Sequence, residues 1–177
     1  MTVNQLKFEQ VLVKKCLKKD RRAQQELFNR YKDAMYTLAY RITGNHDEAS
    51  DALQDCFVNV FMKLEMFKGE ATLGSWIKTI LVRTAVKKTK ATFKYEDLEH
   101  VSQESDLNID DNLAGEAIEK AIINLDDGYR TVFMLIEIEG YKHREVAEIL
   151  NISEGTSKSQ FFNAKRNLRK QLQDIYF

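Results

Sequence analysis

The sequence predicts an all-α protein made of two small helical domains, and three observations support this prediction. The chain of 177 residues contains no proline, the residue that interrupts helices, and only seven glycines. Average usage would give about nine prolines in a chain of this length. Apolar residues recur at intervals of three and four along most of the chain, which is the spacing of one helix face. The length suits one ordinary domain or two small ones.

The first helix is predicted over about residues 8–19, and Asp20 is the predicted N-cap of a longer second helix. A buried stripe along the second helix consists of Leu27, Tyr31, Met35, Leu38 and Ile42. Gly44 and Asn45 tolerate a left-handed backbone, so we expect this helix to end there.

The third helix is predicted to be capped by Asp47, with a fourth running from near Ser75 to about Lys90. The third carries a buried stripe of Ala49, Leu53, Phe57, Val60, Phe61 and Leu64. A loop over residues 67–74 with two glycines separates the two helices. The four helices of residues 1–90 can therefore enclose one core.

Residues 91–112 are predicted to form a flexible acidic linker. They hold seven acidic residues and lack apolar periodicity, so they cannot bury enough surface to offset the entropy of ordering. A second helical domain is predicted over residues 113–177. Its expected helices begin at Leu113 and cover residues 129–139, 143–150 and 153 to about 173.

Charge is divided unevenly although the 27 basic and 27 acidic residues cancel. Residues 1–90 have a net charge of +7, residues 91–124 a net charge of −7, and residues 125–177 are balanced. Either these charges only solvate helix faces, or the basic part binds an acidic partner such as nucleic acid.

Composition argues against a membrane, secreted or catalytic protein. The longest apolar run, residues 132–136, is far shorter than the roughly 20 residues that span a bilayer, and no apolar signal segment opens the chain. Cys16 and Cys56 are expected to be buried, reduced thiols of a cytoplasmic protein. The histidines and cysteines lack metal-ligand spacing, and no nucleotide-binding or hydrolase motif is present. We therefore expect no enzyme, cofactor, metal or small-molecule substrate.

Residues 143–170 have the pattern of a helix-turn-helix, with Ser153 capping the second helix. Burial of Phe161, Ala164 and Leu168 would point a polar face outward. Its members are Lys158, Ser159, Phe162, Asn163 and Arg166. Amide and cationic groups on such a face can contact base edges and phosphates in the major groove. The alternative is an ordinary pair of helices with a solvated outer face.

Two surfaces of the first domain are also candidates for binding. Cations follow a loop that contains aromatic residues and glycine, a combination that can hold single-stranded nucleic acid by phosphate contacts and stacking. A tryptophan such as Trp76 in this pattern is more often a core residue than a platform for base stacking. On the third helix, Glu48, Asp51, Gln54 and Asp55 form an acidic face that is either solvated or docks a basic protein.

Two blocks of motifs resemble the extracytoplasmic-function (ECF) sigma factors of bacterial RNA polymerase. Residues 23–83, with Glu48-Ala49-x-Asp51-x-x-Gln54-Asp55-x-Phe57 and Trp76-Ile77-x-x-Ile80, are similar to sigma region 2. Residues 129–169, with Glu145-Val146-Ala147 and Gly155-Thr156-Ser157-Lys158-Ser159-Gln160, are similar to sigma region 4. The resemblance covers nearly the whole chain.

The resemblance implies a non-enzymatic factor that gives core RNA polymerase its promoter specificity. The implied core polymerase-binding residues, facing the β′ clamp helices, are Asp51, Gln54, Asp55 and Phe57. The implied −10 DNA residues are Gly69, Glu70, Leu73, Trp76, Lys78, Arg83 and Lys87. The implied −35 DNA residues are Lys158, Ser159, Gln160, Phe162, Asn163 and Arg166. The family also implies a contact with the β flap and an anti-sigma partner.

Four positions depart from the family pattern. Arg83 stands where Asn is usual, Leu73 replaces an aromatic residue, Asn163 stands where many members have Arg, and Ser157 replaces an apolar residue. Arg83 and Asn163 predict −10 and −35 preferences that differ from those of relatives, Leu73 predicts weaker base stacking in the loop, and Ser157 predicts a small packing loss.

Two other functions remain open on the sequence. A stand-alone helix-turn-helix regulator would bind duplex DNA without polymerase, but it would need a dimer interface and would leave the acidic face unused. A decoy that binds polymerase but not DNA would not need the cations that follow Trp76.

Overall fold

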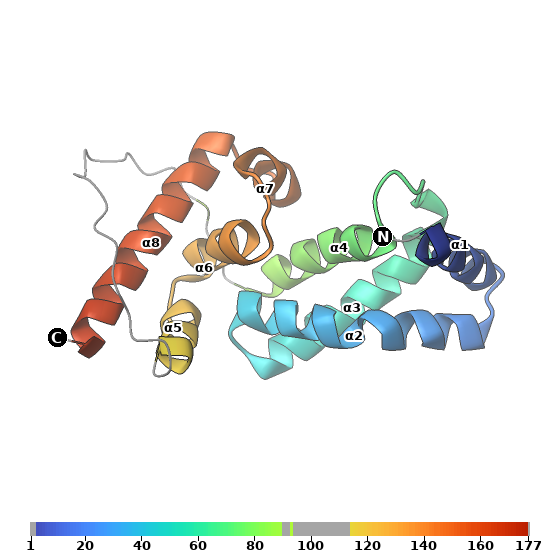
Figure 1. The fold of residues 1–177 in the computed structure, drawn as a ribbon, viewed down its shortest axis with the longest axis horizontal. Coiled ribbons are helices and arrows are strands. Elements are labelled where there is room, and N and C mark those ends of the chain that lie inside the picture. Colours follow the sequence, from blue (N-terminus) through green and yellow to red (C-terminus); the bar gives the residue numbers. More distant parts are fainter. Residues whose placement is uncertain (1–2, 90–92, 94–113, 177) are drawn as a thin grey trace. The chain divides into compact units, whose positions relative to one another are not determined.

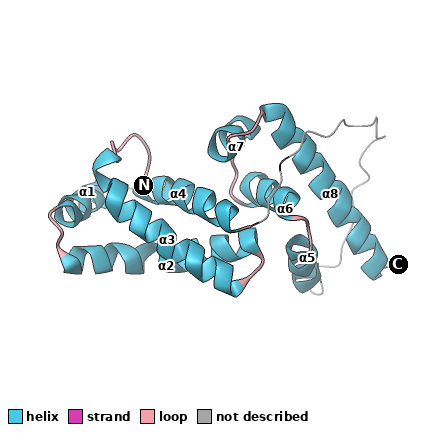
Figure 2. Ribbon diagram, turned by 180° about the vertical axis from the view of Figure 1, so that it is seen from behind, coloured by secondary structure: helices cyan, strands magenta, loops and turns pink. Residues whose placement is uncertain are grey.

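The structure, a computed structural model, describes residues 3–89, 93 and 114–176. The chain divides into two compact units, Met1–Lys88 and Thr89–Phe177. Every regular element in these described stretches is helical, which confirms the all-α prediction (Figures 1 and 2). Apart from Phe93, the predicted acidic linker at residues 91–112 lies outside the described residues. None of the helices in the described part of the chain has the length and apolar character needed to cross a membrane.

The first unit contains four helices and one short 3-10 helix. These are α1 (Val3–Leu17), α2 (Arg21–Thr43), α3 (His46–Lys63), the 3-10 helix η1 (Leu64–Met66) and α4 (Leu73–Lys88). Helices α2, α3 and α4 pack on one another, and α1 packs on α2 (Figure 1). The core between them includes the fully buried side chains of Leu27, Ile42, Val60, Ile77 and Leu81.

Local side-chain hydrogen bonds determine where α2 and α3 begin and end. Asp20 caps α2 as predicted, since its Oδ1 accepts two backbone N–H bonds from the first turn, and Gly44 ends the helix with a φ of +69°. The prediction that Asp47 caps α3 is wrong. The cap is Asn45, whose extended backbone lets its Oδ1 accept from the N–H groups of Asp47 and Glu48 at 2.8 and 3.1 Å.

Helix α4 begins two residues earlier than predicted. The hydroxyl of Thr72 accepts from the N–H of Ser75 at 3.1 Å, and its carbonyl accepts from the N–H of Trp76 at 3.0 Å. Gly74 allows this first turn to approach α2, because a Cβ there would lie only 3.1 Å from Cε1 of Tyr31. The start of α4 is therefore held close against the core.

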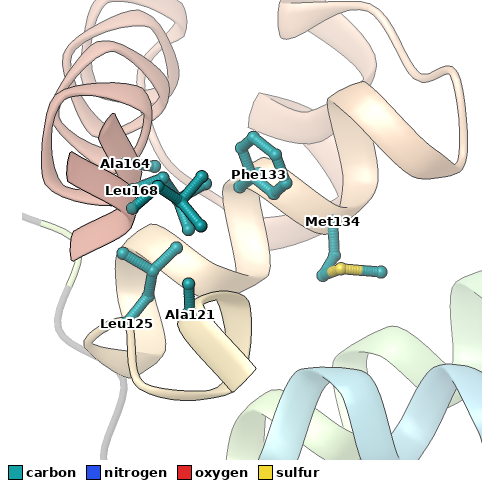
Figure 3. Packing of buried hydrophobic residues seen from close by; sticks show 7 residues of the cluster. Ala121, Leu125, Phe133, Met134, Ala164 and Leu168 are labelled. Atoms are coloured by element: carbon teal, nitrogen blue, oxygen red, sulfur yellow. The ribbon is translucent and has the colours of Figure 1, made fainter. Parts of the chain in front are cut away.

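The second unit contains α5 (Ala114–Ile123), α6 (Asp127–Phe133), the π-helix η2 (Met134–Ile138), α7 (His143–Leu150) and α8 (Glu154–Tyr176). Figure 3 shows its apolar core, whose side chains come from α5, the turn after α5, α6, η2 and α8. The labelled members are Ala121, Leu125, Phe133, Met134, Ala164 and Leu168. Each unit thus has a core of its own.

The single helix predicted over residues 129–139 is an α-helix that widens into a π-helix. The N–H of Glu139 donates to the carbonyl of Met134 five residues earlier, at 3.0 Å. The N–H of Tyr141 donates to Leu135 O at 2.9 Å, and Gly140, with a φ of +73°, ends the element. Apolar spacing in the sequence does not predict this widened turn.

Candidate protein-binding and nucleic-acid-binding surfaces

Helix α3 presents an exposed face that is acidic at one end and apolar at the other. Asp51, Gln54 and Asp55 are exposed and share this face, because they are spaced by three and four residues. The same face continues with Val58, 58% exposed, and Met62, 75% exposed. Sequence analysis missed these two residues, although Val58 lies three residues beyond Asp55 and Met62 four beyond Val58, because an apolar residue in a helical pattern is usually buried.

Phe57 does not belong to this face, which agrees with its place in the buried stripe predicted for the third helix; its implied contact with polymerase stays a prediction. Its side chain is buried, and its ring centroid lies 4.8 Å from that of Phe28 in an edge-on arrangement. Two residues beyond Asp55, the helix has turned by about 200°, so Phe57 points into the core. The predicted docking face therefore consists of its polar members and the two apolar residues beyond them.

An ion pair connects the acidic face of α3 to the basic end of α4. Lys88 Nζ lies 2.7 Å from Oδ2 of Asp55. This hydrogen bond raises the pKa of Lys88, and the charges of Asp55 and Asp51 add to the effect while desolvation opposes it. Sequence analysis did not predict the pair, because its members lie on separate helices.

Helix α4 carries a stripe of Trp76, Thr79, Arg83 and Lys87, spaced at intervals that keep them on one face. Arg83 and Lys87 are exposed, and Thr79 is half-buried. Trp76 is half-buried, and its ring centroid lies 5.4 Å from that of Phe67. The structure thus brings together three of the predicted −10 residues and adds Thr79. Lys78 lies about 200° around the helix from Trp76 and is separate from this stripe.

The loop before α4 exposes Gly69 and Glu70 but not Leu73. Gly69 has a φ of +76°, a conformation that favours glycine. Leu73 is fully buried, so the expectation that it lies in the loop is wrong, while its contact with DNA stays a prediction. As the first residue of α4, it packs into the core of the unit.

Helices α7 and α8 form the predicted helix-turn-helix. Asn151 ends α7 with a φ of +56°, and Ser153 Oγ accepts from the N–H of Thr156 at 2.9 Å to cap α8. Ala147 is buried on α7, which packs against α8. The motif therefore has the short turn and close packing of a DNA-binding module.

The exposed line along α8 consists of Lys158, Phe162 and Arg166, spaced by four residues. Lys158 and Arg166 are exposed and Phe162 is half-buried. Lys158 Nζ lies 2.7 Å from Oε1 of Glu154 one turn earlier. This pairing lowers the pKa of Glu154 through the hydrogen bond and the charge of Lys158.

The other predicted −35 residues lie on the buried side of α8. Ser159, Gln160 and Asn163 are 1%, 2% and 3% exposed, so the prediction of an outward Ser159 and Asn163 is wrong. The buried face of α8 is therefore wider than the predicted one, which consisted of Phe161, Ala164 and Leu168. Ser159 Oγ also donates to the carbonyl of Thr156 at 3.1 Å, which folds it back onto its own helix.

Ser157 forms a polar contact between α7 and α8 where a packing loss was predicted. Its buried hydroxyl lies 3.0 Å from Nδ1 of His143, and the two groups are hydrogen-bonded. Burial lowers the pKa of His143, and the nearby charge of Lys158 acts in the same direction. A hydrogen bond therefore replaces the apolar contact expected there.

The described residues contain no cluster of histidine, cysteine, aspartate and glutamate suited to a metal ion. Cys16 and Cys56 are buried free thiols, as predicted. Burial raises the pKa of Cys56 to about 12, so its thiol is protonated at neutral pH.

Comparison with known proteins relates both units to one family. Residues 27–92 match the model of sigma-70 region 2, and residues 115–168 match that of sigma-70 region 4. The ECF RNA polymerase sigma factor SigW of Bacillus subtilis (strain 168) is 32% identical over 187 residues, covering 94% of this chain and all of that protein. This chain belongs to the ECF sigma factors. It binds core RNA polymerase and directs promoter-specific transcription initiation, and neither alternative function is favoured.

Other relatives agree with this assignment. The ECF RNA polymerase sigma-E factor of Haemophilus influenzae is 25% identical and covers 94% of this sigma factor and 96% of its own chain. The structure of CnrH in complex with the cytosolic domain of CnrY has a TM-score of 0.59 at 20% identity, covering 94% of this chain and 97% of that one. The sigma factor RpoE in complex with the anti-sigma factor NepR from Bartonella quintana has a TM-score of 0.57 at 23% identity. The match covers 84% of this chain and 96% of that one. The two structures share its fold.

Proposed function

We propose that this sigma factor docks on core polymerase through α3, engages the −10 element with α4 and its preceding loop, and reads the −35 element with α8. One observation carries the proposal for the first unit. The acidic face of α3 and the basic stripe of α4 lie on adjacent helices that the Lys88–Asp55 ion pair connects. One small unit thus offers a surface for a basic protein and a surface for nucleic acid.

The docking face consists of Asp51, Gln54 and Asp55, followed by Val58 and Met62. A complementary partner presents cations opposite the carboxylates and apolar groups opposite the valine and methionine. We assign the β′ clamp helices to this face. A partner cation that pairs with Asp55 would displace Lys88, leaving this lysine free to attract a phosphate.

At the −10 element, Arg83 and Lys87 would contact phosphates while Trp76 and Phe67 border a flipped base. A base must leave the duplex before its pairing edge can be contacted. The exposed Gly69 and Glu70 lie in the loop that would receive it. Capture of the flipped base helps open the duplex at the −10 element, so this surface acts by binding and needs no catalytic group.

At the −35 element, Lys158, Phe162 and Arg166 would face the major groove, while the second unit contacts the β flap. When DNA binds, the ion pair of Lys158 with Glu154 would break and Lys158 would pair with a phosphate instead. The buried residues of α8 would have to become exposed before they could contact bases, so we assign direct contact to this exposed line.

We also propose that this sigma factor is not an enzyme, that it works with polymerase in the cytoplasm, and that an anti-sigma factor holds it inactive. CnrH was solved with CnrY and RpoE with the anti-sigma factor NepR. The shared fold supports a partner of the same kind for this chain.

Run-off transcription tests the proposal, using purified core polymerase and a pool of genomic fragments with and without this protein. We expect transcripts from a subset of fragments only when the protein is present. Asp51→Ala/Asp55→Ala should weaken core binding by about tenfold or more, because the partner loses its opposing carboxylates. The control Glu26→Ala/Asp33→Ala, which removes two exposed acids from α2, should leave binding unchanged. Equal binding by both double variants would refute the docking face.

A further inference from the structure

The first unit contains a groove where α1 ends, α2 begins and α3 ends. Figure 1 shows these three ends gathered at one end of the unit. The groove has a volume of about 660 Å³. Its lining includes Cys16, Leu17, Lys19, Arg21, Phe61 and Met62. The proposed polymerase-docking and DNA-binding surfaces share only Met62 with the lining of this groove.

The floor of the groove is apolar and partly open to solvent. Leu17 is 41% exposed and Met62 is 75% exposed, while Phe61 is half-buried and Cys16 is buried. Large apolar side chains exposed around a hollow mark a surface that gains free energy when a partner covers it. The floor therefore suits one or two apolar side chains of a binding partner.

The rim of the groove is strongly basic. Six exposed cations surround the turn between α1 and α2, namely Lys14, Lys15, Lys18, Lys19, Arg21 and Arg22. Asp20, the acid among them, uses its carboxylate to cap α2. Over the stretches that the structure describes, none of the six is in an ion pair. Glu65 is an acidic residue in the lining, so the cations are in excess.

We propose that this groove binds an acidic protein segment that inserts apolar side chains between Leu17 and Met62 and pairs its carboxylates with Lys19 and Arg21. The chemistry favours protein over single-stranded nucleic acid. Nucleic acid would satisfy the cations, but its bases stack on aromatic faces, and Phe61 is the aromatic residue among the lining side chains. An amphipathic acidic helix supplies both the apolar side chains and the negative charge.

The groove shares Met62 with the docking face of α3. A segment bound here covers the apolar end of that face and competes with core polymerase, a consequence that rests on the proposed function. The groove is therefore a surface through which an acidic regulatory protein can lower the amount of polymerase-bound sigma factor.

Nuclear magnetic resonance of the full chain with ¹³C-methyl methionine tests the groove directly. The probe is a synthetic peptide of about 14 glutamate and leucine residues, long enough for about four helical turns, with the leucines on one face. We expect the Met62 methyl signal to move on titration. The methyl signals of Met35 and Met134, which are buried in the two cores, should stay in place.

Three double variants, one of them a control, separate the contribution of charge to peptide binding from that of the apolar side chains. Lys19→Glu/Arg21→Glu should weaken peptide binding by about tenfold or more, whereas Lys120→Glu/Lys170→Glu, the same change in net charge on the second unit, should change it by less than about twofold. Leu17→Gln/Met62→Gln, observed through Lys19 and Arg21 backbone signals, should also abolish binding. Unchanged circular dichroism shows that these surface variants are folded.

Three results would overturn the proposal: no movement of Met62, equal weakening by both charge-reversal pairs, or competition for Met62 by oligothymidine. The last result would assign the groove to nucleic acid instead. Asp51→Ala/Asp55→Ala should keep peptide binding, because neither residue lines the groove. A failure of the polymerase-docking proposal is thereby distinguished from a failure of the groove.

Discussion

At the scale of single residues, Arg130 shows how a charged side chain can stabilise a fold from inside it. Arg130 is buried, and its guanidinium donates to the carbonyls of Ile123 and Leu125 at 2.7 and 2.8 Å and pairs with Asp127. These carbonyls lie at and just after the end of α5, where helical partners are missing. Arg130 thus fastens the connection between α5 and α6.

We expect Arg130→Ala to lower the free energy of unfolding of the second unit by about 2–4 kcal/mol, because two carbonyls and a carboxylate lose their donor. Urea denaturation of the full chain measures the change. Arg144→Ala is the matched control, since Arg144 is exposed and pairs with Glu148 at the surface, so its removal should cost about 0.5 kcal/mol or less. Similar losses for the two variants would show that Arg130 has no special role.

At the scale of elements, the exposed line of α8 predicts how DNA binding depends on salt. Lys158→Ala/Arg166→Ala should weaken holoenzyme binding to −35 DNA and reduce the salt dependence of log K by about 2, because two phosphate contacts are lost. Binding is measured at several salt concentrations with a promoter found by run-off transcription. Lys120→Ala/Lys170→Ala removes two exposed cations elsewhere in the unit and should leave the slope unchanged. An unchanged slope for both variants would exclude phosphate contacts by the α8 line.

The contact between α7 and α8 predicts a loss of stability in mild acid. Burial, together with Lys158, lowers the pKa of His143 below its usual 6.5 in the folded protein. At a pH between this lowered pKa and 6.5, His143 is protonated in the unfolded chain but not in the folded protein. The contribution of His143 to the free energy of unfolding is therefore complete above pH 6.5 and falls as the pH drops below it. The Ser157 hydrogen bond places the imidazole in this environment.

His143→Gln should remove this part of the pH dependence while keeping a polar side chain opposite Ser157. The test is the melting temperature of the second unit at about pH 7.5 and about pH 5.5. The wild-type protein should lose more on acidification than the variant. An equal loss would mean that His143 does not contribute to the pH dependence.

At the scale of the whole molecule, the two separate cores predict that a core substitution in one unit lowers the stability of that unit and not of the other. Leu27→Ala in the first core should cost about 2–5 kcal/mol through lost burial and a cavity, and Val132→Ala removes a buried side chain of the second unit. Hydrogen exchange measured by mass spectrometry should increase in residues 21–88 for the first variant and in residues 114–176 for the second. Increased exchange throughout the chain for either variant would show one cooperative unit.

Much of this architecture could be predicted from the sequence because it depends on neighbours along the chain. Asp20, Gly44 and Ser153 end or begin helices through hydrogen bonds and backbone conformations that involve residues within four positions. The docking face of α3 could be predicted only in part. Asp51, Gln54 and Asp55 are exposed on one face as expected, but Val58 and Met62 on that face were missed because an apolar residue in a helical pattern is usually buried.

The sequence by itself determined the all-α class, the helical blocks and the membership of the ECF sigma factors, because helix periodicity, helix ends and ordered motifs are properties of the chain as written. Tertiary structure alone decided that Leu73 and Asn163 are buried and that Lys88 pairs with Asp55. It also formed the groove between Leu17 and Met62. Burial and ion pairing of this kind depend on how helices distant in sequence pack together, and the local pattern does not contain that information.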